Sequence, residues 1–382
     1  MNINKFVAPE MIFGVGAFSQ VGESALRLGA HKVLIISDPG VSECGWVEQS
    51  FSYLRESGLE YEVWTNLTSN PKDTEVAEGV RKYIESGCDA LLAVGGGSPI
   101  DVAKAIAILA TNGGVIKDYE GINKITRPLP PMVMVPTTAG SGSEVSQFAI
   151  VVDRMRKVKM AIISKSLVPD IAIIDPLLLQ SKDPWLTAAT GMDALSHAIE
   201  SFVSLASTPL TDVNAINAIK LIADNLRESV ACRTNLEAKT SMFMASLQAG
   251  LAFSNAILGA THAMTHQIDG LLDLHHGETN AVLLPYVMEY NTIACADKYR
   301  VVAEAFGEDI TGISKWAAAE KAINAVRQLA RDIGLRDKLH VPEMNDKLIL
   351  SLSASALNDA CIITNPRDAG IDDIASLYRR VF

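Results

Sequence analysis

Residues 90–104 have the sequence ALLAVGGGSPIDVAK, and this stretch decides the fold of the first half of the chain. Residues 90–94 form a short apolar run, which is typical of a buried strand. Three glycines follow, and Ser98 and Pro99 then stand where the N-cap and the first residue of a helix are expected. A buried strand that leads through glycines into a helix is a βα unit, and such units build parallel sheets.

Similar units lie on both sides of this stretch. Short apolar runs predict further buried strands at residues 32–37, 61–64, 132–135 and 171–174. Helical spacing predicts helices near residues 18–29, 46–57, 73–86 and 99–111. A hairpin is expected where residues 148–152 and 158–163 flank a charged turn. Strand and helix in alternation predict an α/β, Rossmann-like domain whose parallel sheet carries helices on both faces.

The second half of the chain has a different hydrophobic pattern, with almost no predicted strand after residue 184. Helical spacing recurs at residues 185–203, 209–230, 235–256, 280–294, 314–333 and 368–381. A chain of 382 residues is also longer than the chains that usually fold around a single hydrophobic core. We therefore expect an α/β nucleotide-binding domain at residues 1–182 and an all-α, metal-binding domain at residues 183–382.

Composition excludes several classes of protein. The chain is 48% hydrophobic and 20% charged, a globular mixture, and its net charge of -11 argues against a nucleic-acid partner. It has no apolar run long enough for a membrane span, and residues 1–10 lack the pattern of a secretory signal, so we expect a cytoplasmic protein. The five cysteines are scattered and never form a Cys-x-x-Cys pair, which favours reduced thiols that act as small buried hydrophobes.

Two glycine-rich loops indicate a phosphate site. Gly95, Gly96 and Gly97 precede a helix whose first N–H groups and positive dipole end favour an anion such as a pyrophosphate. Residues 136–144, PTTAGSGSE, follow another predicted strand, so both loops are expected at the carboxyl edge of one sheet, where nucleotides bind. The spacing is not G-x-G-x-x-G, and an ordinary strand-to-helix turn is the alternative interpretation.

Asp38 stands at the end of the strand predicted at residues 32–37. A carboxylate at this place accepts hydrogen bonds from a ribose 2′-hydroxyl and repels a 2′-phosphate, which favours NAD over NADP. A turn-forming aspartate before Pro39 is an equally good interpretation of the spacing.

Five of the seven histidines fall between residues 197 and 276. Asp193 and His197 are four residues apart, as are His262 and His266, so each pair lies on one face of a helix. His275 and His276 follow shortly after. Imidazoles with one carboxylate suit Fe(II), zinc or a similar divalent ion, whereas each histidine taken alone is more often an ordinary core or surface residue.

These motifs together resemble the iron-containing, group III alcohol dehydrogenases, which have the dehydroquinate-synthase-like fold. The resemblance extends over nearly the whole chain and rests on residues 13–17, 95–104, 136–144, 191–200 and 262–285. It implies a metal held by Asp193, His197, His262 and His276, with iron, zinc or manganese as the ion. His266 is expected to lie near the nicotinamide or in the proton path.

The resemblance also implies nucleotide and substrate contacts. Residues expected at the NAD cofactor are Asp38, Gly95, Gly96, Gly97, Ser98, Asp101, Thr137, Thr138 and Lys159. Residues expected to line the substrate pocket are Gln147, Phe253, Leu258 and His275.

Two residues depart from the family pattern. His275 stands where the family often has proline, and Asp269 stands where it usually has an apolar or small residue. Neither belongs to the expected ligand set, but both affect expectations about the pocket. His275 in particular raises the hypothesis of an anionic substituent, such as a sulfonate, on the substrate.

The expected activity is the NAD-linked, metal-dependent interconversion of a short aliphatic primary alcohol and its aldehyde, by a homodimer or larger assembly. One alternative is a regulatory protein of alcohol metabolism that binds NAD and metal but turns over little. A second alternative is a cyclising lyase of the same fold, which acts on a phosphorylated sugar acid. Such a substrate would require a basic cluster near the metal, and residues 190–280 lack one. A zinc polyol dehydrogenase is a near neighbour whose metal set typically has fewer histidines.

Overall fold

The computed structural model describes residues 5–342 and 344–382. The first four residues of the N-terminal segment considered above therefore lie outside the described part. The chain divides into two compact units, Val7–Ser181 and Lys182–Phe382, and Lys5 and Phe6 group with the second unit. The sequence predicts the division between residues 182 and 183, with the start of the chain in the first domain, and these domain bounds stay a prediction.

The first unit is built on a six-stranded sheet in which every pair of neighbouring strands is parallel. The strands, in spatial order, are β1 (Glu10–Phe13), β9 (Ile171–Ile174), β6 (Met132–Pro136), β4 (Ala90–Gly95), β2 (Lys32–Ile36) and β3 (Glu60–Trp64). The expected parallel sheet is confirmed. The edge strand β1 was not predicted, because its four residues are all at least partly exposed and show no buried run.

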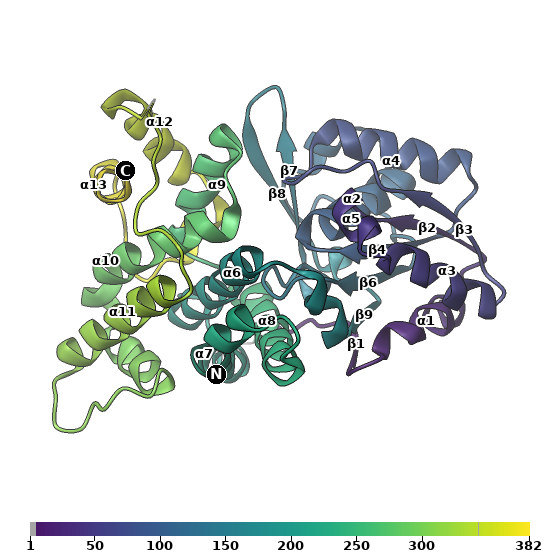
Figure 1. Ribbon diagram of the computed structural model, residues 1–382. Coiled ribbons are helices and arrows are strands. Elements are labelled where there is room, and N and C mark those ends of the chain that lie inside the picture. Colours follow the sequence, from purple (N-terminus) through teal and green to yellow (C-terminus); the bar gives the residue numbers. More distant parts are fainter. Residues whose placement is uncertain (1–4, 343) are drawn as a thin grey trace. The chain divides into compact units, whose positions relative to one another are not determined.

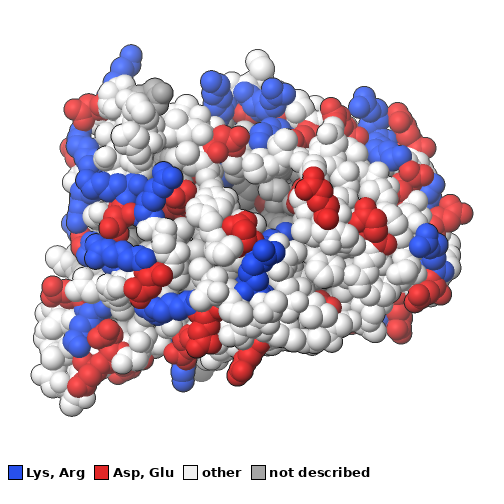
Figure 2. All heavy atoms as spheres, viewed as in Figure 1, with Lys and Arg blue, Asp and Glu red and all other residues white. Residues whose placement is uncertain are grey.

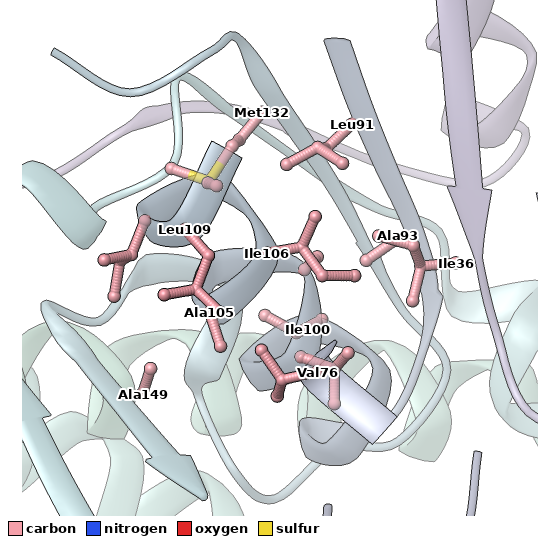
Figure 3. Close-up of a cluster of buried hydrophobic side chains, with 14 of the residues drawn as sticks. Ile36, Val76, Leu91, Ala93, Ile100, Ala105, Ile106, Leu109, Met132 and Ala149 are labelled. Atoms are coloured by element: carbon pink, nitrogen blue, oxygen red, sulfur yellow. The ribbon is translucent and has the colours of Figure 1, made fainter. Parts of the chain in front are cut away.

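Both faces of the sheet are covered by helices, as Figure 1 shows. Leu34 and Ile36 of β2 point to the face packed by α4 and α5, whereas Val33 and Ile35 point to the face packed by α1 and α3. Figure 3 shows the first cluster, in which Ile106 of α5 meets strand side chains from several parts of the sequence. Burial on both faces explains why these strands are continuously apolar rather than alternating.

The helices of the first unit lie close to where their patterns predict them. Their bounds are η1 (Ala17–Gln20), α1 (Val21–Arg27), α2 (Pro39–Glu43), α3 (Trp46–Glu56), α4 (Asp73–Glu85), α5 (Gly97–Asn112), η2 (Ile116–Tyr119), η3 (Ser143–Val145), η4 (Lys165–Leu167) and η5 (Pro176–Ser181). The predicted start of α5 is wrong by two residues. The N-cap is Gly96, not Ser98, and Pro99 lies within the first turn, where its ring packs over Gly95.

The predicted hairpin is present as β7 (Phe148–Asp153) and β8 (Val158–Ile163), which pair antiparallel. With the short strand β5 (Gly121–Ile122) it forms a separate three-stranded sheet. Asp153 closes the turn, since its carboxylate accepts hydrogen bonds from the backbone N–H groups of Met155 and Arg156.

The second unit is helical throughout its described residues, as expected. Its helices are α6 (Pro184–Val203), α7 (Pro209–Ala231), α8 (Leu236–Ala256), α9 (Ala260–Leu272), α10 (His276–Ala305), α11 (Lys315–Asp332), α12 (Asp346–Ala356), η6 (Ala360–Thr364) and α13 (Ile371–Val381). The sequence patterns missed α12 and underestimated α10. The latter contains Pro285 and a break at Cys295, whose φ of -140° is non-helical, so its apolar period is interrupted.

None of the described helices alone is long and apolar enough to cross a membrane. Two consecutive helices, α8 and α9, pass the same test of length and composition only when taken together, and they are bent by 100°.

The surface carries basic and acidic side chains close together. On the face drawn in Figure 2, lysine and arginine are interspersed with aspartate and glutamate. Several form exposed ion pairs, such as Arg379 with Asp346 at 2.9 Å. Exposed pairs of this kind contribute little stability, about 0–1 kcal/mol each.

All five cysteines are free thiols. Cys88, Cys295 and Cys361 are buried, as expected. The expectation is wrong for Cys44 and Cys232, which are exposed because each forms the C-cap of a surface helix.

Candidate metal centre and nucleotide site

Three helices of the second unit bring the expected metal ligands together. Asp193 and His197 lie one turn apart on α6, His262 lies in the first turn of α9, and His276 is the first residue of α10. The Oδ1 atom of Asp193 lies 3.9 Å from Nε2 of His197 and 3.8 Å from Nε2 of both His262 and His276.

These distances suit a shared ion. Two atoms bound to one metal through bonds of about 2.1 Å lie at most roughly 4.2 Å apart. The ligand atoms of Asp193, His262 and His276 all lie within 4.8 Å of one another. His197 lies beside these three residues, because its ring stacks between those of Phe253 and His262, at centroid distances of 4.4 and 4.6 Å.

A glycine allows α10 to start beside α6. A Cβ atom at Gly277 would lie only 2.2 Å from the carbonyl oxygen of Ala189 and 3.3 Å from Cβ of Asp193. A larger residue would therefore push the first turn of α10 away. Gly277 is thus the local reason that His276 reaches Asp193, which the sequence pattern did not reveal.

Glu200, two turns after Asp193 on α6, orients His262. Its Oε2 atom accepts a hydrogen bond from Nδ1 of His262 at 2.6 Å. The same carboxylate accepts bonds from the backbone N–H groups of Gly259, Thr261 and His262, so it also caps the start of α9. With Nδ1 donating to Glu200, the neutral form of His262 has its lone pair on Nε2, the atom that faces Asp193.

Asp269 and His276 form a second carboxylate–histidine pair, with 2.7 Å between Oδ2 and Nδ1. Asn280 then links two of the ligands, because its Nδ2 atom donates to Oδ1 of Asp193 at 2.8 Å and lies 3.1 Å from Nε2 of His262. The Oδ1 atom of Asn280 is buried without a hydrogen-bond partner among the described residues. Glu200 and Asn280 were missed because side chains that support ligands have no spacing signature.

The electrostatics of the cluster favour positive charge. Burial alone would raise the pKa of the Asp193 carboxyl, yet His197, His276 and His262 together hold that pKa well below its usual range. Burial alone would lower the pKa of His262, but hydrogen bonds and charge from Asp193 and Glu200 raise it to about 9. Without a metal, a proton on His262 supplies the positive charge that the carboxylates of Asp193 and Glu200 favour. A divalent cation would supply this charge instead, so the residues of the cluster fit a metal.

His266 lies beside the cluster rather than in it. Its ring stacks on that of His276, with 5.6 Å between centroids. Its Nδ1 atom is 2.9 Å from Oδ2 of Asp359, which also accepts a bond from Gln267. Burial raises the pKa of the Asp359 carboxyl, but His266 more than offsets this and the pKa is lowered, so the carboxylate accepts and Nδ1 of His266 donates.

The expected pocket residues lie in two separate units. Phe253 packs on the ring of His197, and Leu258 is buried in the segment between α8 and α9. His275 is the N-cap of α10 and packs edge-on against Trp185, with 4.7 Å between centroids. Gln147 belongs to the first unit, where its carbonyl accepts a bond from the backbone N–H of Ser164.

Most of the expected nucleotide residues lie in the loops at the carboxyl edge of the six-stranded sheet; Asp101, inside α5, and Lys159, on β8 of the second sheet, do not. Gly95 ends β4 in register with Pro136 of β6, and the N–H of Thr137 donates to the carbonyl of Gly95 at 2.9 Å. Ser37, after β2, donates its hydroxyl to the carbonyl of Val94. Strands β2, β4 and β6 are neighbours, so the loops that follow them share one edge.

Where the loops after β4 and β6 approach each other, there is no room for a side chain at Gly96 or Gly97. A Cβ atom at Gly96 would lie 3.1 Å from Oγ1 of Thr138, and one at Gly97 would lie 3.1 Å from Cβ of Ser141. Gly96 has no side chain to cap the first N–H groups of α5. The hydroxyl of Thr137 is buried without a hydrogen-bond partner among the described residues. A cradle of this kind fits a pyrophosphate.

Asp38 lies directly after β2 and caps α2, because its Oδ1 atom accepts from the N–H of Val41 at 2.9 Å. Asp38 can therefore both cap this turn through Oδ1 and contact a ribose through Oδ2, so the two interpretations of the residue are compatible. Lys159 lies on β8 opposite Val152.

Asp101 is buried inside the first unit, where it accepts a hydrogen bond from the N–H of Ile150. Burial raises its pKa to about 6, with Lys104 opposing that shift. Lys104, which the sequence did not single out, is fully buried and donates to the carbonyls of Ser143, Ser146 and Phe148 at 2.6–2.9 Å. It thereby fixes the end of the loop that follows β6.

The comparisons with known proteins cover both units. The profile of the iron-containing alcohol dehydrogenases matches residues 8–176, and that of the C-terminal domain of the Fe-containing alcohol dehydrogenase family matches residues 187–382. The chain belongs to the iron-containing alcohol dehydrogenase family. It is 45% identical over 372 residues to 1,3-propanediol dehydrogenase of Klebsiella pneumoniae, an alignment that covers 97% of this chain and 96% of that protein.

Solved structures of similar proteins agree. The crystal structure of a 1,3-propanediol oxidoreductase matches with a TM-score of 0.97 and 44% identity over 100% of both chains. Sulfoacetaldehyde reductase from Bifidobacterium kashiwanohense, solved in complex with NAD+, matches with a TM-score of 0.88 and 28% identity over 100% of this chain and 99% of that one. The expected fold and enzyme class, an NAD-dependent alcohol dehydrogenase, are confirmed, as are NAD and iron as cofactors of the family.

Proposed function

We propose that this iron-containing alcohol dehydrogenase interconverts a short aliphatic primary alcohol and its aldehyde, with Fe(II) held by Asp193, His197, His262 and His276. The observation that carries the proposal is the Asp193 carboxylate, whose Oδ1 atom lies 3.8–3.9 Å from three imidazole nitrogens. The similarity to 1,3-propanediol dehydrogenase supports a small, uncharged substrate.

The chemistry divides between cofactors and chain. When bound, the metal supplies Lewis-acid polarisation of the substrate oxygen, and the nicotinamide supplies or accepts the hydride. Glu200 holds the ring of His262 with Nε2 toward Asp193. His266 moves the proton at its Nε2 atom, while Asp359 holds Nδ1. The Gly95–Gly97 loop and Thr137 bind the pyrophosphate, and Phe253 and Leu258 line the pocket.

The experiment that tests this function is a steady-state NADH-oxidation assay on metal-stripped protein reloaded with Fe(II), zinc or manganese. We expect turnover of aldehydes with two to four carbons, restored by metal and highest with Fe(II). If the reloaded protein binds metal and NADH but oxidises NADH with no aldehyde of the panel, the dehydrogenase proposal fails. The regulatory alternative then takes its place.

An anion-substituted aldehyde is the second candidate, and His275 favours it. This imidazole is next to the ligand His276 and replaces a frequent proline, and a structural neighbour is a sulfoacetaldehyde reductase. The same assay decides between the candidates by the ratio of kcat/KM for anionic and neutral aldehydes, in the wild type and in His275→Pro. An unchanged ratio removes the anionic candidate.

Asp38→Asn is expected to relax the preference for NAD. The amide retains the cap on Val41 but removes the charge that would repel a 2′-phosphate. A repulsion of a few kcal/mol at about 4 Å corresponds to a roughly 10- to 100-fold rise in the NADPH/NADH ratio of kcat/KM. Unfolding curves should coincide with the wild type, and an unchanged ratio would leave Asp38 with the capping role alone.

The location and assembly that we propose are a cytoplasmic homodimer. Both are proposed from the family resemblance alone.

A further inference from the structure

Asp269 occupies a place in the fold where a carboxylate is costly. It lies in the last turns of α9, its side chain is fully buried, and burying a charge requires strong compensating hydrogen bonds. Its carboxylate has such bonds: Nδ1 of His276 lies 2.7 Å from Oδ2, and the hydroxyl of Thr279 donates to Oδ1 at 3.0 Å. The carboxylate is therefore anchored by α10 and directed at one histidine.

We propose that Asp269 is a positioning residue of the metal centre, whose carboxylate fixes the ring of His276 with Nε2 toward Asp193. This inference rests on the metal centre of the proposed function. A carboxylate at Nδ1 makes that nitrogen the donor, so the lone pair is on Nε2, the atom 3.8 Å from Oδ1 of Asp193.

His276 needs such support more than the other ligands do. Its side chain is 26% exposed, against 1% for His262 and 6% for His197. The rings of His262 and His197 are held by the packing around them, including their mutual stack at 4.6 Å. The ring of His276 stacks on that of His266 at the longer centroid distance of 5.6 Å, so its hydrogen bond to Asp269 supplies a larger share of its restraint.

The pair repeats an arrangement already present at the other end of α9. At the start of α9, Glu200 of α6 contacts Nδ1 of His262, and near its end Asp269 of α9 contacts Nδ1 of His276 of α10. Each end of α9 thus takes part in one carboxylate–histidine pair.

The test compares Asp269→Asn with the wild type by titrating metal-stripped protein with Co(II) against a chelator. We expect the Kd for Co(II) to rise roughly 10- to 100-fold, as is usual when the partner of a metal-bound histidine is lost. The visible absorption of the bound Co(II) should also change, and the thermal midpoint of the metal-free protein should stay within a few degrees.

Two further variants make the result decisive. Asp273→Asn removes the same charge from the exposed connection after α9 and is expected to leave the Kd unchanged. Thr279→Val keeps the carboxylate but removes its second anchor, and is expected to weaken Co(II) binding by a smaller factor; it decides the question if Asp269→Asn does not fold.

Equal Kd values for the wild type and Asp269→Asn would overturn the inference, and so would an equal loss in Asp273→Asn. A wild type that binds no Co(II) would instead contradict the proposed metal centre itself. The two failures are therefore distinguishable.

Discussion

Replacing His262 with alanine is expected to remove metal and turnover together. His262 supplies Nε2 to the cluster and is the most buried of its histidines, so no neighbouring group replaces it. The loss of metal affinity should exceed the roughly 100-fold that losing a ligand's outer partner costs. Metal content per chain after desalting, measured by elemental analysis, and NADH oxidation are the two readouts.

His340→Ala is the matched control, because His340 is exposed and far along the sequence from the cluster. It should retain full metal content and activity. His262→Gln, which fills more of the space beside Glu200, separates the loss of a ligand from the loss of packing. Unchanged metal content in both His262 variants would contradict the ligand assignment.

His266→Ala is expected to lower kcat while metal content stays near that of the wild type. His266 lies beside the cluster, and its Nδ1 atom is held by Asp359 rather than by a ligand. Removal of a general acid or base typically costs about 10²- to 10⁴-fold. The measurement is kcat for aldehyde reduction together with elemental analysis of the same sample.

Loss of metal in His266→Ala would make this histidine a ligand instead of a proton carrier. Asp359→Asn provides the graded comparison, since an amide preserves the shape of the carboxylate while weakening its hold on Nδ1. It should lower kcat in the same direction and by a smaller factor. An unchanged kcat in both variants would leave His266 as a packing residue.

The sequence predicts the architecture well because its signals are local. Residues 90–94 are apolar throughout since both faces of β4 are covered, and the glycines that follow mark the turn into α5. The exact start of α5 was not predictable. Ser98 and Pro99 have the residue types of a cap and a first helical position, but α5 starts two residues earlier, at Gly97 after the N-cap Gly96, and glycines carry no side-chain signal for a helix start.

The cluster of histidines was also visible in the sequence, because i,i+4 pairs place side chains on one helix face. The groups that support it were not. Glu200 contacts His262 across 62 residues of sequence, Asn280 contacts Asp193 across 87, and Asp359 contacts His266 across 93. Only the packing of helices shows which of these side chains meet. Lys104 similarly acts across the fold, on carbonyls about forty residues away.

One carboxylate, Glu200, serves the backbone at the start of α9 and the ring of His262 at the same time. Whatever strengthens the hold on His262 therefore also strengthens the first turn of that helix. Metal binding and the ordering of the backbone around Gly259 and Thr261 are therefore expected to be thermodynamically linked. A change that makes this turn unfold more easily should also weaken metal binding, and bound metal should protect the turn from local unfolding.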